Sequence, residues 1–129
     1  MNAINTKKDA GMNNQRKESR KKLVAFTPVY DLVHKALIGY VGDLNPLGVL
    51  VIGEKSLEIN KRLMLGIEFP DDESKAHTLK IVLSARVAWC RQDETPQYFN
   101  IGFEFLDISP ENAKIIDAIL NRYQFRHVM

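Results

Sequence analysis

Cysteine, histidine and long apolar runs are scarce in this chain of 129 residues. Cys90 is the only cysteine, so no disulfide can form within the chain, and a reducing cytoplasmic setting is expected. No stretch approaches the roughly 20 apolar residues of a membrane helix, and the N-terminus has no apolar run of signal-peptide length. We therefore expect a cytoplasmic protein without a membrane span.

Residue patterns for catalysis or metal binding are also missing. The histidines His34, His77 and His127 fall in different segments, without the short spacing of metal ligands. Cys90 lies inside a predicted strand with no adjacent histidine, and we expect it to be a small buried apolar residue. The sequence contains no nucleophile elbow, Walker loop or Gly-x-Gly-x-x-Gly motif. We expect no enzymatic activity, no metal and no cofactor.

Positive charge is concentrated at the N-terminal end. Residues 1–22 hold seven basic and two acidic residues, so the rest of the chain has a net charge of −3 although the whole chain has +2. Residues 1–14 are polar, and we expect a disordered tail there. Residues 15–22 carry five positive side chains, including Arg16 and Arg20. Such a local surplus suits a small anionic ligand or a docking arm better than a broad nucleic-acid surface.

Six segments have the composition or the period-two alternation of strands. They are 23–30, 36–41, 49–52, 61–69, 77–91 and 97–107. The clearest apolar faces are Leu63, Leu65, Ile67 and Phe69; Ile81, Leu83, Ala85, Val87 and Trp89; and Phe99, Ile101, Phe103 and Phe105. Residues 43–48 have the composition of a turn. Short turns without intervening helices favour an antiparallel barrel or sandwich.

A helix is expected at the C-terminal end of this β pattern. Ser109 is a good N-cap, and Pro110 suits the first helical position. Apolar residues then recur at helical spacing from Ala113 to Tyr123. The sequence therefore predicts a helix over about 109–125 that closes one end of a single β domain spanning 15–125.

Two short motifs on this pattern resemble the PilZ domain, a bacterial receptor module for cyclic di-GMP. Arg16-Lys17-Glu18-Ser19-Arg20 matches its Arg-x-x-x-Arg motif. Asp43-Leu44-Asn45-Pro46-Leu47-Gly48 matches its Asp/Asn-x-Ser-x-x-Gly motif, with Asn45 where serine is usual. Arg86-Val87-Ala88-Trp89 and Ile101-Gly102-Phe103-Glu104-Phe105 are also similar to the family. The resemblance, which covers about 15–123, implies an all-β fold with one C-terminal helix: a six-stranded antiparallel β-barrel of split-barrel type capped by an α-helix.

The resemblance also implies a cyclic di-GMP site made of Arg16, Arg20, Asp43, Asn45 and Gly48. The two arginines would bind phosphate and the guanine Hoogsteen edge. Asp43 would accept hydrogen bonds from guanine N1–H and N2–H, and Asn45 would offer its amide. Gly48 would let the backbone turn under the ligand.

Trp89 is a further candidate, for stacking on a base at the rim of the barrel. In the predicted strand it shares the face of Leu83 and Val87, so packing in the core is an equally good interpretation.

The function that the resemblance implies is a non-enzymatic receptor. Ligand binding would order residues 15–22 over the barrel and signal to an unnamed partner protein that controls motility, adhesion or biofilm formation. Asn45 prompts one alternative, a protein-interaction adaptor that has lost nucleotide binding. A small RNA- or DNA-binding barrel is another alternative, but the strands show no exposed aromatic platform on a basic face.

Overall fold

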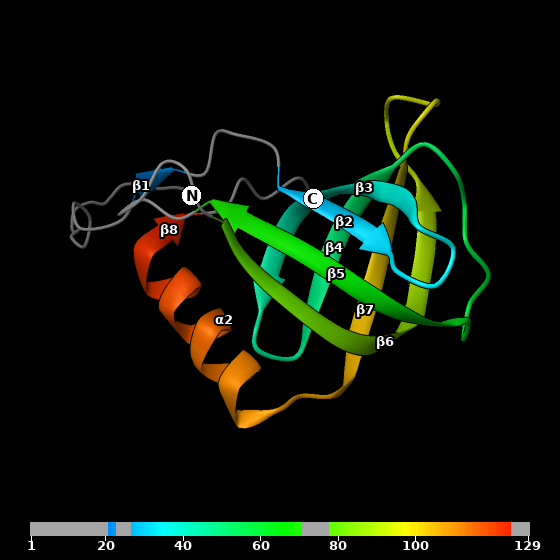
Figure 1. Cartoon of the computed structure of the whole chain (residues 1–129). Coiled ribbons are helices and arrows are strands. Elements are labelled where there is room, and N and C mark those ends of the chain that lie inside the picture. The colour runs from blue at the N-terminus through cyan, green and yellow to red at the C-terminus, as the bar shows by residue number, and fades with distance from the viewer. Residues whose placement is uncertain (1–20, 23–26, 71–77, 125–129) are drawn as a thin grey trace.

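Six strands close into one antiparallel barrel in this computed structural model, which describes residues 21–22, 27–70 and 78–124 (Figure 1). The barrel strands are β2 (Pro28–Asp31), β3 (Ala36–Asn45), β4 (Gly48–Gly53), β5 (Arg62–Pro70), β6 (Thr78–Gln92) and β7 (Phe99–Asp107). Their order is β2-β3-β4-β7-β6-β5, and pairing of β2 with β5 completes the ring. The expected six-stranded antiparallel barrel with a C-terminal helix is confirmed.

Alternating apolar residues form the core, as the period-two pattern predicts. Leu65, Ile67 and Phe69 of β5 are fully buried, and so is Ile101 of β7. The intervening positions of β5 are mostly polar or small, and they are occupied by Arg62, Met64, Gly66 and Glu68. Closure removes all sheet edges from the barrel, so every barrel strand finds two backbone partners.

A bulge in β6 reverses the alternation near its end. Val87 pairs with Phe103, but Trp89 pairs with Gly102, so Ala88 is the extra residue. The side chain of Trp89 therefore leaves the core face, and Cys90 takes the inward position and packs against the core. The prediction that Trp89 shares the face of Val87 is wrong, because a period-two count assumes uninterrupted pairing.

The turn predicted over 43–48 is much shorter in the structure. Asp43 and Asn45 belong to β3, and Asn45 pairs directly with Gly48, the first residue of β4. Only Pro46 and Leu47 connect the two strands. The motif is therefore the tip of a β-hairpin, and its side chains have fixed positions on the barrel wall.

Helix α2 (Pro110–Arg122) covers one end of the barrel (Figure 1). Ser109 caps it, since its Oγ accepts a hydrogen bond of 3.1 Å from the backbone N–H of Asn112. Ile116 and Ile119 are buried and belong to the barrel core. The helix passes directly into β8 (Tyr123–Gln124), which pairs in parallel with β1 (Lys21–Lys22). The sequence pattern did not predict this two-stranded pair.

Asp31 organises the tight connection between β2 and β3. Its Oδ1 accepts hydrogen bonds from the backbone N–H groups of Val33 (3.1 Å) and His34 (3.3 Å), and its Oδ2 lies 2.8 Å from His34 Nδ1. Burial raises the pKa of the Asp31 carboxyl, but the hydrogen bonds from His34 and Val33 outweigh burial, so the pKa is lowered.

Replacing Asp31 with asparagine should lower the free energy of unfolding at pH 7 by about 1–3 kcal/mol. A carboxyl whose pKa is lower in the folded state stabilises fully above its unfolded pKa of about 4, and that stabilisation is lost as the pH falls through the folded pKa. The difference between parent and Asp31→Asn should therefore narrow below about pH 4. Urea unfolding at pH 7 and pH 3 measures this difference in the free energy of unfolding. Asp117→Asn, on the exposed side of α2, is the control. An equal difference at both pH values would contradict a role for the ionised carboxylate.

Candidate functional site

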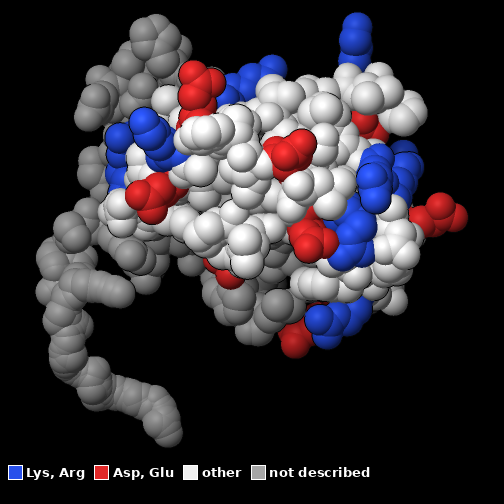
Figure 2. All heavy atoms as spheres, turned by 90° about the horizontal axis from the view of Figure 1, so that it is seen from below, with Lys and Arg blue, Asp and Glu red and all other residues white. Residues whose placement is uncertain are grey.

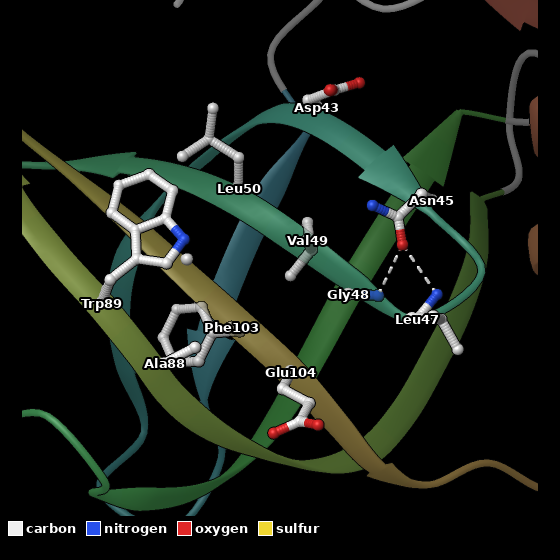
Figure 3. A pocket seen from close by; sticks show the side chains of 11 residues that line it. Asp43, Asn45, Leu47, Gly48, Val49, Leu50, Ala88, Trp89, Phe103 and Glu104 are labelled. Carbon is white, nitrogen blue, oxygen red and sulfur yellow. Dashed lines mark hydrogen bonds between the residues drawn. The ribbon is translucent and has the colours of Figure 1, made fainter.

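A hollow of about 310 Å³ lies on the outer wall of the barrel, over β3, β4, β7 and β6 (Figure 3). The residues that line it are Asp43, Asn45, Leu47, Gly48, Val49, Leu50, Ala88, Trp89, Gly102, Phe103 and Glu104. Four of the residues predicted as ligand contacts thus line one hollow: Asp43, Asn45 and Gly48 from a single hairpin, and Trp89 from the distant strand β6. Arg16 and Arg20 lie outside the described residues.

The strand register arranges the lining in two parallel rows. One row runs Asp43, Leu50, Gly102 and Trp89, and the next runs Asn45, Gly48 and Glu104. Arg86 continues the second row beyond Glu104 but does not line the hollow. Each row has a glycine near its middle, and a glycine adds no side chain to the wall. The hollow therefore lies between the side chains toward the ends of the rows.

The two glycines are required by close approach of other groups. A Cβ on Gly48 would lie 2.2 Å from the backbone oxygen of Phe103, so β4 and β7 can only pair this closely with glycine here. A Cβ on Gly102 would lie 2.2 Å from the indole Nε1 of Trp89. Gly48 was predicted to let the backbone turn under a ligand, and the close approach of β7 is a second reason for glycine at this position. Gly102, which was not predicted as a site residue, makes room for the Trp89 ring.

Asn45 builds the hairpin turn. Its Oδ1 accepts hydrogen bonds from the backbone N–H groups of Leu47 (2.7 Å) and Gly48 (2.9 Å), as Figure 3 shows. The backbone N–H of Phe105 donates to the oxygen of Leu47 (2.9 Å), which ties the turn to β7. An asparagine here can replace serine as a turn-forming acceptor, while its Nδ2 group remains a potential donor to ligand.

The charges that line the hollow are acidic. Asp43 is half-buried, and its Oδ1 accepts a hydrogen bond from the backbone N–H of Leu44 (2.9 Å). Glu104 forms an ion pair with Arg86 of the neighbouring strand. Among the described lining residues there is no lysine or arginine. An anionic ligand in the hollow would therefore need positive charge from another part of the chain.

Trp89 has a second neighbour besides Gly102. The guanidinium carbon of Arg91 lies 4.6 Å from the centre of the Trp89 ring, a cation–π contact. The indole is thus positioned by protein groups without any ligand. The bulge at Ala88 turns it outward, and no feature of the residue pattern revealed this bulge.

The described part of the chain holds neither a cluster of potential metal ligands nor a helix that could span a membrane. Within residues 21–22, 27–70 and 78–124, no three histidine, cysteine or acidic side chains are grouped so that they could hold a metal ion. None of the helices in these ranges is long and apolar enough to cross a membrane.

Comparison with known proteins identifies the family of this barrel. The PilZ domain matches residues 14–122, a range that includes both predicted motifs, and the chain belongs to this family. No curated protein matches the chain. Among solved structures, the Bacillus subtilis inhibitor of motility, MotI/DgrA, is similar with a TM-score of 0.62 and 18% sequence identity. The alignment covers 83% of this chain and 50% of that one, so the chain spans half the length of MotI/DgrA.

Proposed function

We propose that this protein is a cyclic di-GMP receptor without catalytic activity. The observation that carries the proposal is the convergence of Asp43, Asn45 and Trp89 on one hollow of a PilZ barrel. The indole supplies a flat surface for a base, and the carboxylate accepts the N1–H and N2–H donors of guanine. These groups suit the bases of the ligand.

The phosphates would be bound by the N-terminal basic segment. Asp43 and Glu104, the charged residues among the described lining, repel phosphate, so Arg16 and Arg20 are the natural source of positive charge. Arg20 directly precedes β1, which is held beside the end of α2 by its pairing with β8. In this proposal the barrel recognises the bases and the segment 15–22 closes over the phosphates.

The expected output is a change of surface that a partner protein reads. Closure of residues 15–22 would alter the face next to the hollow. In the cytoplasm a partner protein would bind according to this change, and motility, adhesion or biofilm formation would respond. The likeness to an inhibitor of motility favours motility among these outputs. A nucleic-acid partner is less favoured, since acidic side chains lie among the basic ones on the face shown in Figure 2.

Isothermal titration calorimetry with cyclic di-GMP tests the proposal, with pGpG, GTP and single-stranded RNA as controls. Trp89 is the only tryptophan, so its fluorescence reports on the hollow in the same titration. We expect saturable heat and a change in emission with cyclic di-GMP, and weaker binding of pGpG and GTP. No heat at high micromolar cyclic di-GMP would favour the adaptor, and selective heat with RNA would favour a nucleic-acid-binding barrel.

A further inference from the structure

We propose that Glu104 recognises the second guanine of cyclic di-GMP, while Asp43 recognises the first. This inference rests on the proposed function and adds a residue that decides specificity. Glu104 and Asp43 lie on opposite sides of the hollow, one on β7 and one on β3 (Figure 3). A ligand with two bases can therefore meet a carboxylate at each side.

The strand register places Glu104 close to the stacking surface. Glu104 follows Gly102 by two residues on β7, so both face the outside of the barrel. The indole of Trp89 packs on Gly102, since a Cβ there would clash with Nε1. In the proposed binding mode, a base that stacks on Trp89 turns one edge along β7 toward Glu104.

A carboxylate at this edge discriminates between purines. An ionised carboxylate only accepts hydrogen bonds. Guanine presents two adjacent donors, N1–H and N2–H, to such a group, whereas adenine presents an N1 acceptor beside its single amino group. Glu104 would therefore favour guanine over adenine at the base stacked on Trp89.

Arg86 positions this carboxylate and offsets its charge. Its Nε donates to Glu104 Oε1 (3.0 Å), and its Nη2 donates to the same oxygen. Its Nη1 donates to Asn60 Oδ1 (2.6 Å), which fixes the guanidinium from the other side. Within the described residues, Glu104 Oε2 makes no hydrogen bond, so one oxygen is available to a base. The ion pair also limits repulsion between Glu104 and the ligand phosphates.

The test compares parent, Glu104→Gln and the control Glu68→Gln, whose side chain belongs to β5 outside the hollow. Each is titrated with cyclic di-GMP and with 3′,3′-cyclic GMP-AMP, which has one guanine and one adenine. Glu104→Gln should weaken cyclic di-GMP binding about tenfold, the effect of losing a charge-assisted hydrogen bond. Its affinity for cyclic GMP-AMP should hardly change, so the preference for two guanines disappears. Glu68→Gln should bind like the parent.

Three results would overturn the inference. Glu104→Gln could bind cyclic di-GMP as tightly as the parent or more tightly, which would show that the carboxylate makes no favourable contact with the ligand. Glu104→Gln could also lose affinity for both ligands equally, which would show a general effect on the hollow rather than reading of one base. A parent protein that binds neither ligand would overturn the proposed function as well, so the two failures are distinguishable. Melting temperatures of all variants show that each is folded.

Discussion

Replacing Arg16 or Arg20 with alanine should weaken cyclic di-GMP binding by about 1.5–3 kcal/mol each, which is at least about tenfold in affinity. The charged residues that line the hollow in the described structure, Asp43 and Glu104, are both acidic. The two arginines would therefore supply the charge-assisted hydrogen bonds to phosphate. Calorimetry measures the affinity, and the melting temperature should barely change because both residues precede the barrel strands.

Lys55→Ala is a suitable control, since it removes one positive charge from an exposed position after β4 and outside the hollow. It should lower affinity far less than either arginine variant. Arginine variants that bind like the parent would show that the basic segment does not bind the phosphates. Arginine variants that unfold would show that the segment is structural.

Replacing Gly48 with alanine should destabilise the fold by about 3 kcal/mol or more, an effect at the upper end of those caused by overpacking. The new Cβ would lie 2.2 Å from the backbone oxygen of Phe103, and a strand-paired carbonyl cannot move away without breaking the β4–β7 ladder. Urea unfolding of parent and variant measures the loss.

Gly42→Ala is the matched control on the neighbouring strand. Its Cβ would meet the side-chain ends of Ile52 and Leu50 at 3.0–3.4 Å, and side chains can adjust by such small amounts. It should cost much less stability than Gly48→Ala. If Gly48→Ala keeps the parent's stability but loses ligand binding, Gly48 is there to make room for ligand and not for β7.

The sequence predicted the barrel well where alternation is uninterrupted. The faces that contain Leu65 and Phe103 are buried as expected, because β5 pairs with β6, and β7 with β4, without a register shift. The prediction failed at Trp89 and at the 43–48 turn. A bulge and a two-residue hairpin depend on backbone pairing with another strand, and residue periodicity carries no information on that partner.

The candidate site was only partly accessible from the sequence for the same reason. Asp43, Asn45 and Gly48 belong to one continuous motif, so a family resemblance identifies them together. Glu104 and Gly102 reach the hollow only through the register of β7 with β4 and β6. No local pattern distinguishes Glu104 from any other outward-facing glutamate.

The pairing of β1 with β8 has a mechanical consequence. The two strands are parallel and two residues long, so the chain enters the pair at Lys21 and leaves it at Gln124. Tension that draws the preceding segment away from Lys21 acts along the strand and loads these backbone hydrogen bonds in shear. Because β8 continues α2 without a break, the load passes directly to the last turn of the helix. The joint is only two residue pairs long and therefore weak, so a modest pull would separate β1 from β8.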